Sequence, residues 1–190
     1  HSSKRPRILI GKDTRKSGDM LEAALTAGLC SMGAKVIPLG VVPTPAVAYL
    51  TRYYKADAGV VISASHNPCE YNGIKFFNSD GYKLSDGIEN EIESYILGEK
   101  AIEELPTHGK VGYVSANHNA VEDYVAFAVS TIDCRLDGMK IAVDCANGAS
   151  YETAFKALNK LGANVEAIHN TPDGVNINHM CGSTHMESLQ

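Results

Sequence analysis

The sequence lacks any long hydrophobic run. No uninterrupted apolar stretch approaches the roughly 20 residues that a membrane-spanning helix needs, and the N-terminal segment HSSKRPRILIG does not have the pattern of a secretion signal. Because neither an anchor nor an export signal is visible, we expect a cytoplasmic protein that has no membrane partner.

A basic excess is also missing. The chain has 17 Lys and Arg residues against 22 Asp and Glu residues, which gives a net charge of −5 at pH 7. DNA and RNA are held largely by a field of positive charge, and this chain has no such field. We therefore expect no nucleic-acid partner, and any phosphate ligand must be held by local groups.

Cysteine is sparse and never occurs in a C-x-x-C pair. An odd, scattered set of this kind argues against both a disulfide framework and a zinc ribbon. The histidines around Cys181 have the spacing H-x-C-x₃-H, which fits no standard zinc motif, so a loop explains them equally well. We expect reduced thiols at all five cysteines: Cys30, Cys69, Cys134, Cys145 and Cys181.

Strand and helix patterns alternate along the chain. With 190 residues and 44% hydrophobic residues, the chain can build one full core and part of a second. Short apolar runs predict strands, and apolar residues at spacings of three and four predict helices between them. The predicted strands are 7–11, 35–39 and 58–62, and the predicted helices are 19–32, 46–54, 85–97 and 120–131. This order predicts an α/β fold with a mixed, mainly parallel sheet covered by helices.

The alternation restarts after residue 135. Residues 139–144 and 164–168 read as strands, with a helix predicted over 152–161. We therefore predict a first domain over residues 1–135 and the start of an incomplete second α/β domain over residues 136–190. The chain is expected to be a piece of a longer protein.

A polar motif follows the apolar run 58–62 directly. The sequence there reads ISASHNP, with Ser65 at its centre, and open α/β sheets place ligand sites at such strand ends. The motif is not a nucleophile elbow, since G-x-S-x-G is absent, and His66 is adjacent to Ser65 and therefore poorly placed as its base. Taken alone, the segment could equally be a polar turn set by Pro68.

Two cations strengthen the case for phosphate chemistry. Residues 73–78 and 81–84 read as a hairpin, which can bring Lys75 back beside Ser65. Arg15, in the loop after the first strand, is a second candidate phosphate contact, although it could also be a solvated loop charge. A serine that carries a phosphoryl group needs cations and a metal ion to balance the charge on the transferred oxygens.

These motifs carry a resemblance to the α-D-phosphohexomutase superfamily. The segment GVVISASHNPCEYNGIKFFNSDGYKLSD (59–86) is similar to the superfamily's phosphoserine signature, and four further segments follow in the superfamily's order. They are GKDTRKSGDMLEAAL (11–25), GVVPTPAVAYLT (40–51), VDCANGAS (143–150) and DGVNINHMCGSTH (173–185). The resemblance covers nearly the whole chain.

The resemblance implies specific roles for residues of the motif. Ser65 would be the phosphoserine, His66 and Lys75 would act with it in catalysis, and Arg15 and Asn67 would contact phosphate. One Mg²⁺ per active site would be bound by Ser65 through its phosphoryl group, and its remaining ligands, the aspartates of a D-G-D-G-D-R loop, do not occur in this chain. The implied partners are small sugar phosphates, and a homodimer is compatible with the family.

The resemblance also implies a reaction. The most similar branch interconverts glucosamine 6-phosphate and glucosamine 1-phosphate, on the bacterial route to cell-wall precursors, through a phosphoserine enzyme and a bisphosphate intermediate. Alternatives are the branch that acts on mannose and glucose phosphates, or an inactive piece that keeps the fold. Because the sugar-recognition loop is absent from the sequence, we expect no appreciable turnover by these 190 residues alone.

Overall fold

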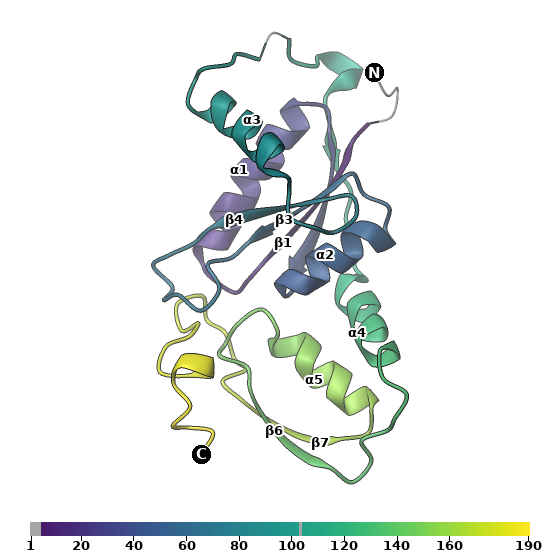
Figure 1. Cartoon of the computed structure of the whole chain (residues 1–190), viewed down its shortest axis with the longest axis vertical. Coiled ribbons are helices and arrows are strands. Elements are labelled where there is room, and N and C mark those ends of the chain that lie inside the picture. Colours follow the sequence, from purple (N-terminus) through teal and green to yellow (C-terminus); the bar gives the residue numbers. More distant parts are fainter. Residues whose placement is uncertain (1–4, 103) are drawn as a thin grey trace.

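The computed structural model describes residues 5–102 and 104–190 and contains two β-sheets in two lobes (Figure 1). The first lobe is built from β1 (Arg7–Lys12), α1 (Ser17–Ser31), β2 (Lys35–Val41), α2 (Thr44–Tyr53), β3 (Ala58–Ile62), β4 (Ile74–Asn78), α3 (Asp86–Ile96) and β5 (Tyr113–Val114). Helix α4 (Ala120–Ser130) follows, and the second lobe is built from β6 (Lys140–Asp144), α5 (Tyr151–Lys160), β7 (Asn164–Ile168) and the residues after it. Short 3₁₀ turns occupy His108–Lys110 and Gly182–Thr184.

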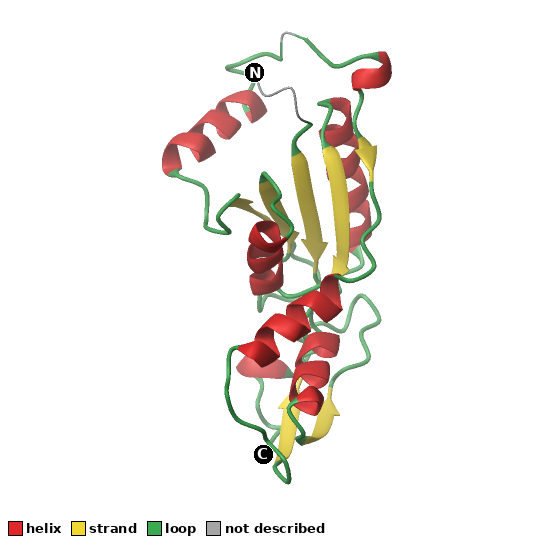
Figure 2. Ribbon diagram, turned by 90° about the vertical axis from the view of Figure 1, so that its right-hand side faces the viewer, coloured by secondary structure: helices red, strands yellow, loops and turns green. Residues whose placement is uncertain are grey.

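The larger sheet has the strand order β4-β3-β1-β2-β5. Strand β1 pairs in parallel with β2 and β3, β2 pairs in parallel with β5, and only β4 is antiparallel to its neighbour. Helices lie on both faces of this sheet (Figure 2). The predicted fold class, a mixed and mainly parallel sheet covered by helices, is confirmed.

Adjacent residues of β1 point into different cores. Leu9 packs with Val47 and Leu50 of α2, whereas Ile10 packs with Leu25 of α1 on the opposite face. Side chains of a strand alternate between the two faces of a sheet, so one short apolar run can supply both cores. This explains why the buried strands carry continuous hydrophobic runs.

The predicted hairpin between residues 73–78 and 81–84 is only partly present. Residues 81–84 form no strand, and they pair with β4 only through an isolated bridge between Phe77 and Lys83 and through backbone hydrogen bonds of Asn78 with Gly81 and Tyr82. The Asn78 side chain accepts the backbone N–H groups of Asp80 and Tyr82, so the chain turns away toward α3. The antiparallel pair that does form is β3 with β4, and it encloses the ISASHNP loop.

The second sheet contains two parallel strands, β6 and β7, which α5 joins. Helix α4 lies beside both lobes, since it contacts α2 and α5. Glu122 of α4 accepts hydrogen bonds from Lys156 and Lys160 of α5 at 2.6 and 2.8 Å, and these bonds, that of Lys156 first, lower the pKa of Glu122 to about 2. Because α4 connects the lobes, the division at residues 135 and 136 stays a prediction.

Among the described residues, no helix is both long and apolar enough to cross a membrane.

Candidate functional site

The ISASHNP loop lies at the carboxyl ends of the central parallel strands. Loops that follow β1, β2 and β3 meet there, and the backbone N–H of Asp13 donates to the carbonyl of Ile62 at 3.0 Å. Carboxyl ends of parallel strands share one edge of a sheet, which is where open α/β sheets bind ligands. The motif therefore lies where the sequence predicts it, at the carboxyl end of a parallel strand.

The buried Arg15 side chain fixes the backbone of the ISASHNP loop. Its guanidinium is fully buried and pairs with the Asp13 carboxylate at 2.9 Å. The remaining donors reach three carbonyl groups of the loop, those of Ser65 at 3.0 Å, Asn67 at 2.8 Å and Pro68 at 2.5 Å. A planar guanidinium has several N–H groups and can therefore donate to several acceptors at once. The predicted phosphate contact of Arg15 stays a prediction, and the geometry assigns this side chain to positioning the loop.

A second side chain holds the same carbonyl groups from the other lobe. The Asn178 amide donates to the carbonyl oxygens of Ser65 and Asn67, at 3.0 Å each. Two further bonds join the lobes nearby, from the Lys16 N–H to the Gly174 carbonyl and from the Thr14 hydroxyl to the Asn147 carbonyl. The loop is thus bound from both lobes.

Ser65 itself presents an exposed side chain on this fixed backbone. It has a φ of 58°, in the left-handed region, and its N–H donates to the Ser63 hydroxyl at 3.1 Å. Such a conformation costs about 1–3 kcal/mol in a residue other than glycine, so the surrounding bonds must maintain it. Within residues 5–102 and 104–190 the Ser65 hydroxyl makes no hydrogen bond, which leaves it available to a ligand.

The Ser65 side chain lines a cleft between the lobes. The cleft has a volume of about 380 Å³, within the range of about 300–1,000 Å³ that is typical of small-molecule sites. Asp13, Ser63 and Ser65 line one wall, and Asp144 and Ser183 belong to the other. A ligand in this cleft would touch both lobes.

The other predicted site residues lie around this loop with fewer fixed contacts. His66 and Asn67 follow Ser65 and are exposed. Lys75 is exposed on β4, where its Cα is opposite Val61, four residues before Ser65. Among the described residues, no hydrogen bond joins Lys75 to Ser65, so a joint role of the two residues in catalysis stays a prediction.

Two features of the site were not predicted from the sequence. The role of Asn178 depends on contacts to residues 111 and 113 positions away, which no local pattern indicates. The described histidines and cysteines also cluster differently: Cys181 lies with Asp144 and His169, and not with His179 and His185. The spacing of H-x-C-x₃-H could not reveal a partner on another strand.

The fold and the loop are those of a known family. Residues 1–103 match the family model described as phosphoglucomutase/phosphomannomutase, alpha/beta/alpha domain I. The chain belongs to this family, and the resemblance to phosphohexomutases is confirmed.

Individual relatives give a more specific similarity than the family model does. The chain is 63% identical over 185 residues to a phosphoglucosamine mutase of Acetivibrio thermocellus and 62% identical over 185 residues to one of Clostridium acetobutylicum. Each match covers 97% of this chain and 41% of the relative, so the chain spans well under half the length of these proteins. A crystal structure of a phosphoglucomutase/phosphomannomutase family protein from Burkholderia thailandensis is 26% identical, with a TM-score of 0.73 over 92% of this chain and 38% of that chain.

We expect that replacing Asn178 with alanine loosens the Ser65 loop. The change removes two hydrogen bonds, worth about 0.5–1.5 kcal/mol each, and leaves the lobes in place through the bonds of Lys16 and Thr14. Amide hydrogen exchange at Ser65 and Asn67 should quicken about tenfold or more. Asn159→Ala is the control, because that amide bonds only within α5. Equal exchange in both variants would show that Asn178 does not fix the loop.

Proposed function

We propose that the protein containing this chain is a phosphohexomutase that interconverts glucosamine 6-phosphate and glucosamine 1-phosphate. One observation carries the proposal: the Ser65 hydroxyl is exposed in a cleft, while Arg15 and Asn178 fix the backbone on which it stands. Relatives named phosphoglucosamine mutase, at 62–63% identity, support the choice of sugar. The setting proposed with it is the synthesis of cell-wall precursors in the cytoplasm.

In the proposed reaction Ser65 carries the phosphoryl group. The bond from phosphorus to the Ser65 oxygen breaks as a bond to a sugar hydroxyl oxygen forms, and the hydroxyl proton leaves to a base. The resulting bisphosphate reorients in the cleft. The bond from its other phosphorus to the sugar oxygen then breaks as the bond to the Ser65 oxygen forms again, and the sugar oxygen takes up a proton. Phosphoryl transfer depends on positioning and charge balance, so a rigid loop with an exposed serine suits this role.

The neighbouring residues have supporting roles in this proposal. Lys75 balances the charge of the phosphoryl oxygens or assists proton transfer, and His66 and Asn67 shape the same end of the cleft. Arg15 acts through the loop, because the bonds described above already engage its guanidinium.

A Mg²⁺ ion belongs to the proposal, and the residues present fit only part of its site. The Ser65 oxygen is exposed and would reach the ion through its phosphoryl group, whereas the Asp13 carboxylate is paired with Arg15. Magnesium requires several oxygen ligands, and we expect the remaining ones in the D-G-D-G-D-R loop that the resemblance implies, outside this chain. When bound, the ion supplies charge neutralisation at the transferred phosphoryl group.

A second candidate is a mutase for mannose or glucose phosphates. The structural similarity to the Burkholderia thailandensis protein, whose family name includes both activities, favours it. The Ser65 loop serves a phosphoryl group on any sugar, so it does not separate the two candidates. A homodimer remains a prediction for either.

A substrate comparison tests the proposal. The longer protein is assayed with glucosamine 6-phosphate, glucose 6-phosphate and mannose 6-phosphate, and we expect kcat/KM to be at least about tenfold higher for the amino sugar. A preference for either of the others would favour the second candidate. The 190 residues alone are expected to give no appreciable turnover, and measurable turnover would contradict the proposed need for ligands outside the chain.

A further inference from the structure

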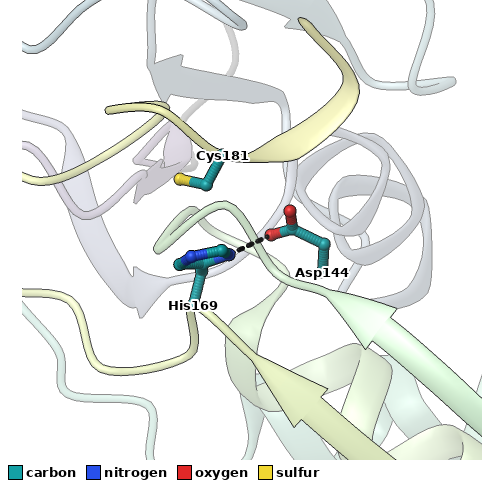
Figure 3. Close-up of side chains that lie close together, drawn as sticks. All are labelled: Asp144, His169 and Cys181. Carbon is teal, nitrogen blue, oxygen red and sulfur yellow. Dashed lines mark hydrogen bonds and ion pairs between the residues drawn. The ribbon is translucent and has the colours of Figure 1, made fainter. Parts of the chain in front are cut away.

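A separate group of side chains lies in the second lobe (Figure 3). Asp144 ends β6, His169 follows β7 directly, and Cys181 precedes the last 3₁₀ turn. The three residues each bring one potential metal-binding atom within 4.8 Å of the others, and they are the one such group in the described part of the chain. We call them the Asp144 cluster. Asp144 also lines the cleft between the lobes, but the reaction proposed above uses none of the three side chains.

The spacing within the cluster is close to that of zinc ligands. The distance from Asp144 Oδ1 to His169 Nδ1 is 3.1 Å. Ligand bonds of about 2.1 Å in a tetrahedral arrangement place two such atoms roughly 3.4 Å apart, and a thiolate roughly 3.6 Å from either. The carboxylate and imidazole are therefore nearly in place, and the Cys181 sulfur, within 4.8 Å, has to approach by at most about 1.2 Å.

The Asp144 carboxylate is held in a fixed orientation. Its Oδ1 accepts the N–H of Ala146, and its Oδ2 accepts the N–H of Gly182, both at 2.8 Å. Burial by itself would raise the pKa of Asp144, but these donors and His169 together lower it below its ordinary value. Hydrogen bonds that orient a ligand in this way are typical of metal sites.

A nucleophilic cysteine is a poorer interpretation of the same residues. Cys181 is fully buried, so a substrate has no access to its sulfur. Burial first, and then the Asp144 charge, raise the pKa of this thiol, whereas nucleophilic cysteines need a lowered one. A bound metal ion would favour the thiolate over the thiol, because its positive charge displaces the thiol proton.

We propose that Asp144, His169 and Cys181 bind a divalent transition-metal ion of the zinc class. One oxygen, one nitrogen and one sulfur donor suit Zn²⁺ or Co²⁺ and do not suit Mg²⁺ or Ca²⁺, which take oxygen ligands. The His169 side chain is 31% exposed, which gives the ion access and leaves a position for water. The ion would join the ends of β6 and β7 to the segment of Asn178, three residues before Cys181.

Titration with Co²⁺ and Zn²⁺ tests this site. In the 190-residue chain, we expect one equivalent of Co²⁺ to give a thiolate-to-cobalt charge-transfer band, Zn²⁺ to displace it, and binding to release one proton from the Cys181 thiol. Zinc should also raise the melting temperature. No stoichiometric band and no proton release would overturn the proposal and leave a hydrogen-bonded pair beside a neutral thiol.

Variants assign the band to these residues. Cys181→Ser should abolish it, and His169→Ala, at a more exposed position, should weaken zinc binding by more than roughly tenfold. The controls are Cys69→Ser and His185→Ala, whose residues line a different pocket, and both should keep the band. If Cys69→Ser lost the band and His169→Ala kept it, the metal site would lie in that other pocket. This result would overturn the proposal even if Cys181→Ser failed to fold.

Discussion

Replacing Ser65 with alanine is expected to remove mutase activity from the longer protein by a factor of at least about 10³. The substitution deletes the oxygen that carries the phosphoryl group and leaves the loop backbone, with its bonds to Arg15 and Asn178, intact. The steady-state rate with glucosamine 6-phosphate is measured together with the mass of the peptide that contains residue 65. The parent peptide should carry one phosphoryl group, and the variant should carry none.

Ser79→Ala is the matched control for this experiment. Ser79 is exposed in the turn after β4 and takes no part in the cleft between the lobes. It should keep full activity and leave the phosphopeptide unchanged. Full activity in Ser65→Ala, or a phosphoryl group found on another serine, would refute the proposed mechanism without affecting the family assignment.

Replacing Arg15 with alanine is expected to lower the free energy of unfolding by about 3–5 kcal/mol. The change leaves the buried Asp13 carboxylate without its cation and three loop carbonyl groups without this donor. Such a loss is a large part of the 5–15 kcal/mol that stabilises a typical domain. Urea denaturation followed by circular dichroism measures it. Lysine should restore little, because a single ammonium group cannot reach all four acceptors.

The chain offers a close control for the Arg15 prediction. Arg135 also pairs with an aspartate two residues away, Asp137, at 2.9 Å, but both side chains are more than 60% exposed. Arg135→Ala should therefore cost no more than about 1 kcal/mol. Adding Asp13→Asn to Arg15→Ala should recover part of the lost stability, since the unpaired charge disappears. If it recovers none, an uncompensated carboxylate is not the source of the loss.

Arg15 also illustrates what the local sequence leaves open. An arginine in a polar loop after a strand reads as a surface cation or a phosphate contact, because either is common. Its actual burial follows from the crossing of two chain segments, since the ISASHNP loop lies 50 or more residues away and closes over it. A sequence pattern carries no information on whether a loop will be covered by another loop.

The hairpin after β4 shows a different limit. Turn-forming residues Ser79 to Gly81 predict a reversal of the chain, and the reversal occurs. Whether a strand follows depends on cross-strand partners, and the Asn78 side chain supplies competing hydrogen bonds to the backbone there. The prediction of a turn was right, and the prediction of residues 81–84 as a strand was wrong.

The sequence by itself determined the alternation of strands and helices, the mainly parallel sheet and the place of Ser65 at a strand end, because these follow from local periodicity and from the geometry of parallel strands. The tertiary structure decided which side chains surround that serine. Arg15 and Asn178 meet the loop, and Asp144 meets His169 and Cys181, only after segments far apart in the chain have packed together. Such meetings depend on how whole elements fit in space, which no short stretch of residues encodes.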